Sequence, residues 1–196
     1  MSVENMAVRT IREQLKRCRD LWYCCKDTAG SQIAEFAVSL PLLAAVIIGI
    51  TDFSSAFNLK FKLSNAAHEG ARFASTQSTS DLSDTPPASI TAIRDVVNSY
   101  LVGDRVNTCG LETATPANSV MVWTYTANTG CPGTFTLTID RGSTTVTGGV
   151  TVEATRVSVS YPFQWRFSKV IKVLIPGAVY AGVSYLNNAS AMQNLN

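Results

Sequence analysis

Glu35 is the residue of this sequence whose chemistry most needs an explanation. It lies inside the apolar stretch formed by residues 30–50, and the next charged residue after it is Asp52. An ionised carboxylate in a lipid-facing segment costs on the order of 3 kcal/mol or more, so such residues usually have a function. The simpler interpretation is that Glu35 lies at the membrane interface, where water hydrates it.

The other reactive side chains do not form a catalytic pattern. His68 is the only histidine, beside Glu69, and a solvated or packed role is expected for it. The sequence holds no HExxH motif, phosphate-binding loop or nucleophile elbow. The acids beyond the apolar stretch are scattered without paired spacing. We therefore predict no enzyme activity, no catalytic residue, no cofactor and no metal site.

Nucleic-acid binding is also not expected, because the C-terminal part has no basic cluster that matches a run of phosphates. Arg166, Lys169 and Lys172 recur at helical spacing and form its best basic stripe. Most such stripes are solvated helix faces, and a contact with lipid head groups is the alternative.

The element that carries Glu35 is a candidate membrane helix. Residues 33–50 make 18 positions, roughly 27 Å of α-helix, which is close to the thickness of a bilayer core. Residues 1–30 contain six Lys or Arg and four acids, whereas residues 31–196 contain ten of each. Basic residues before a span predict that its N-terminal side stays in the cytoplasm. We expect a single pass through the inner membrane with the C-terminal domain outside.

The residues around this helix resemble a known family. Residues 30–36, GSQIAEF, resemble the cleavage and assembly signature of prepilins. The continuation resembles the TadE-like minor pilins of tight-adherence pili, through AEFA at 34–37, PLL at 41–43, GITDF at 49–53 and NAAHEGAR at 65–72. The resemblance is specific from Gly30 to about Ala74.

The resemblance implies a role in pilus assembly. A membrane prepilin peptidase would cut between Gly30 and Ser31, and Glu35, followed by Phe36, would set the register between subunits. In stacked helices, the Glu35 carboxylate would meet the new amine of a neighbouring subunit, and an unpaired charge would remain costly. The implied partners are other pilin subunits, the peptidase, the inner-membrane assembly platform and the lipid bilayer.

The five cysteines divide at the membrane helix. Cys18, Cys24 and Cys25 precede it, where a reducing cytoplasm keeps thiols free. Cys109 and Cys131 follow it, so we predict a disulfide between them; two buried free thiols are the alternative. The Cys24–Cys25 pair lacks zinc-finger spacing.

The pattern along the chain predicts a pilin-like α+β fold. A helix is expected from about Ser31 to Ala74, kinked near Pro41, with small and apolar residues at intervals of three and four. A loop at 75–89 and a second helix at 90–101, with Gly103 past its end, come next. Strands are expected at 120–126, 135–139, 150–163 and 179–186, forming an antiparallel sheet of about four strands covered by the long helix. One further helical turn or two is expected at 167–174.

These elements give four segments. They are a basic leader at 1–30, which is removed on cleavage, a membrane helix at 31–52, its continuation outside the membrane at 53–78, and an outer α+β domain at 79–196. The leader can also be interpreted as an amphipathic helix on the membrane surface. Phe53, Phe57, Phe61 and Phe73 are expected to pack in the core, with an aromatic binding stripe as the alternative.

Three functions remain after these observations. The leading hypothesis is a minor pilin or pseudopilin that helps to initiate or build a tight-adherence pilus or lies at its tip. The second is an uncleaved single-pass membrane protein whose outer domain binds a ligand or partner. The third, an extracytoplasmic enzyme, would require a concave site with convergent polar groups.

Overall fold

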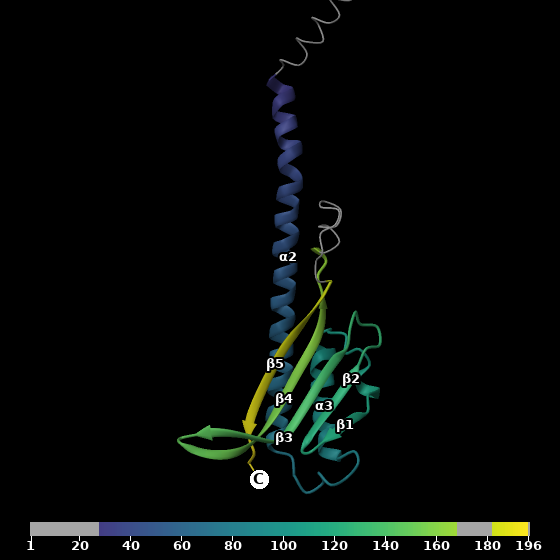
Figure 1. Ribbon diagram of the computed structural model, residues 1–196, viewed down its shortest axis with the longest axis vertical. Coiled ribbons are helices and arrows are strands. Elements are labelled where there is room, and N and C mark those ends of the chain that lie inside the picture. The colour runs from purple at the N-terminus through teal and green to yellow at the C-terminus, as the bar shows by residue number, and fades with distance from the viewer. Residues whose placement is uncertain (1–27, 168–181, 196) are drawn as a thin grey trace, which may run out of the picture. The chain divides into compact units, whose positions relative to one another are not determined.

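The computed structural model describes residues 28–167 and 182–195. Its first element is the helix α2, Thr28–Ser75, which continues through Pro41 as one α-helix of 48 residues (Figure 1). The chain divides into two compact units, residues 1–47 and 48–196. We call the second the sheet unit; it contains the C-terminal part of α2 and all the strands.

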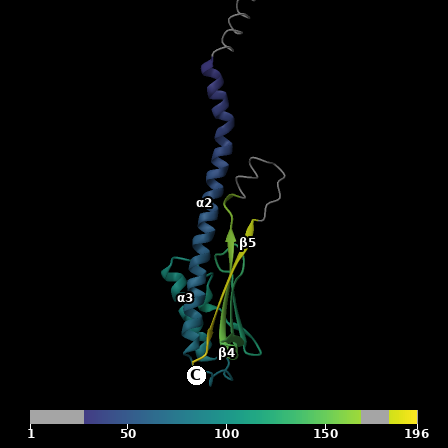
Figure 2. The same ribbon diagram turned by 90° about the vertical axis from the view of Figure 1, so that its left-hand side faces the viewer.

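Five antiparallel strands form one sheet in the order β1-β2-β3-β4-β5. They are β1 Pro116–Ser119, β2 Val122–Ala127, β3 Phe135–Thr147, β4 Val150–Gln164 and β5 Val183–Gln193. Each strand pairs with the next in sequence, so the sheet is a simple meander. Within the sheet unit, both helices lie on one face of this sheet, as the edge-on view shows (Figure 2).

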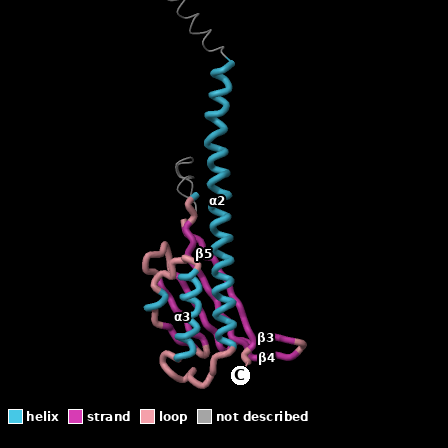
Figure 3. The backbone as a smooth tube through the Cα atoms, turned by 180° about the vertical axis from the view of Figure 1, so that it is seen from behind, coloured by secondary structure: helices cyan, strands magenta, loops and turns pink. Residues whose placement is uncertain are grey.

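The second helix, α3 Ala88–Gly103, lies beside the C-terminal part of α2 on this face (Figure 3). It buries Ile90, Ile93, Val97 and Leu101 at the predicted helical spacing. A short 3-10 helix, η1 Leu111–Thr113, follows it. The core of the unit is therefore a single layer of apolar side chains between two helices and one sheet face.

Alternation along the central strands explains which sheet face is covered. Trp123, Tyr125, Leu137, Ile139 and Val157 are buried against the helices. Their neighbours along the strands include many Thr and Ser, whose side chains project from the opposite face. This is the hydrophobic-in, polar-out pattern of an antiparallel sheet with one covered face.

The α+β prediction, with a long helix on an antiparallel sheet, is confirmed. The structure differs from the prediction in some details. The sheet has five strands rather than about four. The prediction missed the short edge strand β1 because its residues carry no strand signal of their own. Gly103 is the last residue of α3 rather than the residue past its end. The sequence offers Arg141–Gly142 or Gly148–Gly149 as a turn between strands; the β3–β4 turn falls at Gly148–Gly149, both with positive φ, and Arg141–Gly142 lies in a bulge inside β3.

Two predictions fall partly or wholly outside the described residues. The predicted strand at 179–186 is observed from Val183 to Gln193, and its first residues are not described. The helical turns expected at 167–174 lie almost entirely outside the described part of the chain, as do Lys169 and Lys172.

Candidate functional site

The residues of the prepilin signature lie near the start of α2. Gly30 is exposed, and a Cβ added to it would meet nothing within 4 Å. Glu35 is exposed in the following turn, and Phe36 beside it is 61% exposed. A side chain added at Gly30 would therefore meet open space among the described residues.

The apolar residues that follow are not covered within the described structure. One described helix is long and apolar enough by length and composition to cross a membrane, and its most apolar window has a mean hydropathy of 2.3. Val38, Leu42 and Val46 are all more than half exposed. Such a surface fits a membrane-anchored protein, because lipid can cover it.

In the sheet unit, α2 uses its smallest residues to contact its own domain. Ala66, Ala67, Ala71 and Ala74 are fully buried, and Gly70 is buried between them. A Cβ added at Gly70 would lie 2.6 Å from Cγ2 of Val97 on α3 and 3.4 Å from Cγ1 of Val157 on β4. All of these α2 residues except Ala74 belong to the NAAHEGAR segment. Its small side chains therefore let the helix approach both α3 and the sheet closely.

The opposite side of the same helix presents large aromatic residues. Phe53, Phe57 and Phe61 are 58%, 60% and 69% exposed, and Ile50 is 64% exposed. The expectation that these phenylalanines pack in the core is wrong for all three; of the four, only Phe73 packs against the core. At intervals of four they share one helix face, which we call the outward face.

Asp52 lies on the inward side, at the end of the apolar run. It is 3% exposed, and its carboxylate accepts a hydrogen bond from the backbone N–H of Phe167 at 2.5 Å. Phe53 contacts the ring of Trp165 edge-on, with the ring centroids 5.3 Å apart. The first polar turn after the span is therefore fixed to the end of β4.

His68, the only histidine, is an exposed residue of α2 whose ring nitrogen lies 3.4 Å from the Ser190 hydroxyl. No group of three or more His, Cys, Asp or Glu within the described ranges is placed to hold a metal ion. This contact joins α2 to β5.

Cys109 and Cys131 form a disulfide, with their Cα atoms 5.5 Å apart. Cys109 is fully buried and Cys131 packs at the edge of the core. The bond joins the loop after α3 to the loop between β2 and β3.

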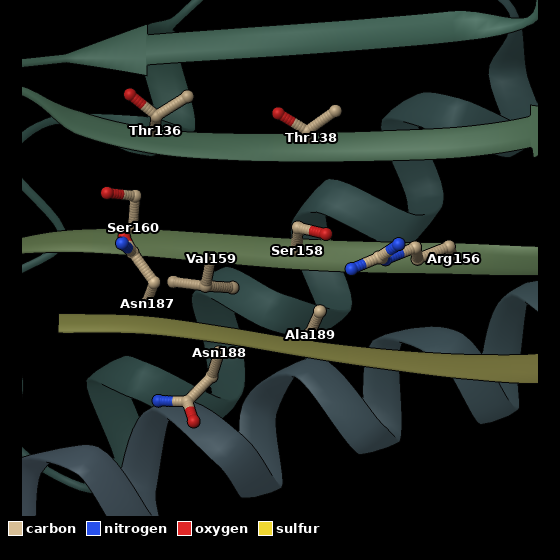
Figure 4. Close-up of a pocket in the computed structure, with 9 residues that line it drawn as sticks. All are labelled: Thr136, Thr138, Arg156, Ser158, Val159, Ser160, Asn187, Asn188 and Ala189. Carbon is tan, nitrogen blue, oxygen red and sulfur yellow. The ribbon is translucent and has the colours of Figure 1, made fainter.

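A hollow on the uncovered face of the sheet is lined mainly by hydroxyl and amide side chains (Figure 4). Thr136, Ser160 and Asn187 pair across three strands in one row, and Thr138, Ser158 and Ala189 form the next row. These residues line a shallow hollow of about 390 Å³, and Arg156 is the one charged residue among them. The hollow offers hydroxyl and amide groups and no carboxylate.

The comparisons with known proteins support the resemblance. Residues 30–72 match the family model for TadE-like proteins. The matched segment contains the prepilin signature, the apolar helix and the NAAHEGAR segment, and the strands lie outside it. The resemblance to TadE-like pilins of tight-adherence pili is confirmed over this segment. Neither the curated proteins nor the solved structures gave a match to this chain.

The C-terminal end of α2 has a partner that sequence patterns did not indicate. Arg141, 2% exposed in the β3 bulge, donates to the carbonyl oxygens of Ala74, Gln77 and Ser78 at 2.5, 2.9 and 3.2 Å. It thereby holds the C-terminal end of α2. The Arg141–Gly142 pair was one of two candidate turns in the sequence, and nothing local to it indicated a contact with the end of α2.

Proposed function

We propose that this protein is a minor pilin or pseudopilin of a tight-adherence pilus, cut between Gly30 and Ser31, that takes part in initiation or at the tip. Its partners are other pilin subunits, the prepilin peptidase and the inner-membrane assembly platform. The single observation that carries the proposal is the outward face of α2, formed by Ile50, Phe53, Phe57 and Phe61.

The outward face needs a partner on energetic grounds. Burying a phenylalanine side chain fully is worth about 1.5–3 kcal/mol, and Phe57 and Phe61 lie on this helix face beside Phe53, which is in part covered by Trp165. The inward side of the same helix is already occupied by its own domain. A neighbouring apolar helix is the partner that matches a row at this spacing, and bundled N-terminal helices supply one.

Glu35 gives such a bundle its axial register. After cleavage, the ammonium of Ser31 and the carboxylate of Glu35 lie four residues apart. In a staggered bundle the carboxylate of one subunit pairs with the amine of the next, and incorrect stagger leaves a costly unpaired charge. The protein is held in the inner membrane with its N-terminus in the cytoplasm before cleavage and its sheet unit outside.

Intact-mass spectrometry of the membrane-extracted protein tests the cleavage. We expect a mature protein that begins at Ser31. In a Gly30→Leu variant, we expect the uncut mass, because a bulky side chain replaces the hydrogen at the cleavage residue. Full-length wild-type protein in assembled pili, or processed Gly30→Leu protein, would contradict the proposal.

Site-specific photocrosslinking tests the outward face. A photoreactive phenylalanine analogue at Phe57 should crosslink to another pilin subunit in intact cells. The matched control is the same analogue at Ser99, an exposed position on α3. Crosslinking to lipid alone at Phe57 would favour the alternative, an uncleaved membrane protein whose outer domain binds a partner. The polar hollow on the uncovered sheet face is the feature that favours this alternative.

A further inference from the structure

The sheet unit contains a cleft whose charged residues are all basic. It has a volume of about 420 Å³ and lies between α2, the loop after α3 and the end of β4. Lys62, Arg105 and Arg166 line it, with Ser55, Asn58, Asn107 and Tyr161 as further polar groups. No carboxylate lines it, although residues 31–196 contain as many acids as bases. We call it the cationic cleft.

Arg105 is held in the cleft by an unusual backbone conformation. Its φ is +59°, in the left-handed region that disfavours residues with a Cβ. The turn that imposes it is closed by hydrogen bonds from the Arg105 N–H to Val102 and from the Val106 N–H to Leu101, both at 2.9 Å. A glycine would adopt this conformation without strain, so an arginine here points to a use of its side chain.

The walls of the cationic cleft are tied together. Lys62 donates from Nζ to the carbonyl oxygen of Asp104 at 2.7 Å, which joins α2 to the loop. Asn107 donates to the carbonyl oxygen of Gly130 at 3.0 Å and accepts from the backbone N–H of Cys109 at 2.9 Å. The Cys109–Cys131 disulfide lies next to these bonds. The cleft is therefore preorganised, which lowers the cost of ordering side chains around an anion.

An aromatic cluster adjoins the cationic cleft. A second cleft of about 630 Å³ shares Ser55, Leu59, Tyr161 and Arg166 with it and is also lined by Asp52 and Trp165. Trp165 donates from its indole N–H to the Ser184 hydroxyl at 2.8 Å. Its ring contacts Phe53 and Phe163, with centroids 5.3 and 5.0 Å away. Tryptophan beside basic residues is typical of the membrane–water interface.

The end of the cationic cleft that is lined by Ser55 lies at the depth of lipid head groups. Ser55 lies five residues after Ile50, the last residue of the apolar run, which is about 7.5 Å of helix. The head-group layer extends roughly 5–8 Å beyond the hydrocarbon on each side of a bilayer. Arg166 lines the cleft together with Ser55, whereas Lys62 lies twelve residues after Ile50, about 18 Å of helix, so the cleft extends from the head-group layer outward.

We propose that the cationic cleft binds the phosphate group of an anionic phospholipid, with Arg105, Arg166 and Lys62 as the cations that contact it. The aromatic cluster favours lipid over a free phosphate ion as the source. The proposal rests on the membrane anchor of the proposed function, but it requires neither cleavage nor pilus assembly. A binding experiment on the solubilised full-length protein therefore separates the failure of one from the failure of the other.

The test is a titration of the detergent-solubilised full-length chain with short-chain phosphatidylglycerol, short-chain phosphatidylcholine and inorganic phosphate. Binding is measured as the rise in thermal midpoint, which a ligand specific for the folded state produces. We expect phosphatidylglycerol to bind roughly tenfold more tightly than either other ligand. Equal affinities for the two lipids would overturn the proposal, and so would inorganic phosphate binding as tightly as phosphatidylglycerol.

Variants assign the binding to the cleft. The double variant Arg105→Gln with Arg166→Gln should lose the preference for phosphatidylglycerol. The matched control, Lys60→Gln with Arg72→Gln, removes two exposed cations outside the cleft and should keep it. Arg105→Gly removes a cation while relieving the backbone strain, so it should weaken binding without lowering the midpoint of the unliganded protein. Unchanged binding in the double variant and in Arg105→Gly would overturn the proposal.

Discussion

The guanidinium of Arg141 donates to the carbonyl oxygen of Ala74 at 2.5 Å, across 67 residues of sequence. The same group also binds the carbonyls of Gln77 and Ser78, so one side chain satisfies three acceptors at and beyond the end of α2. Burial lowers the pKa of Arg141 from its usual value, and the Asp81 carboxylate acts in the opposite direction. This contact joins the end of α2 and the loop after it to the sheet.

Replacing Arg141 should destabilise the sheet unit. Arg141→Met removes the donors of three buried or half-buried carbonyls, and hydrogen bonds to a charged group are worth about 1.5–3 kcal/mol each. We expect a loss on the order of 3 kcal/mol, measured as the thermal midpoint of the full-length protein in detergent. Arg156→Met, at an exposed arginine on β4, is the control and should have little effect. Equal midpoints for the two variants would show that the Arg141 contacts are not stabilising.

Gly70 should not tolerate a methyl group. The Cβ of Gly70→Ala would lie 2.6 Å from Val97, a fully buried residue whose branched side chain has few rotamers. Overpacking of this kind costs about 1–3 kcal/mol, which exceeds the gain of roughly 1 kcal/mol in helix propensity. Gly103→Ala, at a helical glycine with open space around it, is the control and should be neutral or stabilising. Chemical denaturation of both variants checks this, and a stabilised Gly70→Ala would contradict it.

Asp81 should make stability depend on acid pH. Burial alone raises its pKa, but hydrogen bonds from the N–H and the hydroxyl of Ser89, at 2.7 and 2.8 Å, outweigh burial and place it below the usual 3.8. The stabilisation is therefore complete above pH 3.8 and is lost as the pH falls through the lower folded-state pKa. The urea midpoint of Asp81→Asn should fall less between pH 7 and pH 3 than that of the wild type. Ser89→Ala should give an intermediate result, and a wild-type pH dependence in Asp81→Asn would exclude this role.

The disulfide should stabilise the sheet unit under oxidising conditions. The cysteines are 22 residues apart, and closing a loop of this size is worth about 2–4 kcal/mol. Cys109→Ser should lower the thermal midpoint accordingly. Reductant should lower the wild-type midpoint toward that of the variant and leave the variant unchanged. A midpoint that does not respond to either change would mean that the two thiols are not joined in the cell.

Glu35 should affect assembly and not cleavage. In Glu35→Ala, the mature protein should still begin at Ser31, but its amount in the sheared pilus fraction should fall severalfold, because the charge pair that sets the stagger is lost. Gln32→Ala, at an exposed position one turn earlier, is the control. Immunoblots of the sheared and membrane fractions measure the ratio, and normal incorporation of Glu35→Ala would rule out the register role.

The sequence alone determined the elements that local patterns specify. The apolar run identified the membrane helix, the spacing of Ile90, Ile93, Val97 and Leu101 identified α3, and alternation identified the central strands. These signals depend on neighbours within one helix turn or one strand, so no long-range contact was needed to interpret them. The prepilin signature is likewise a local motif.

The tertiary structure decided which apolar face of α2 is covered. Periodicity indicated a face of small and apolar residues, and that face is the buried one, but the sequence also assigned the phenylalanines to the core, where three of the four do not pack. The small residues around Gly70 face inward because only they let two helices and a sheet approach closely, and this leaves Phe57 facing outward. The capping role of Arg141 and the cationic cleft of Lys62, Arg105 and Arg166 also depended on the fold, because each combines residues from segments far apart in sequence.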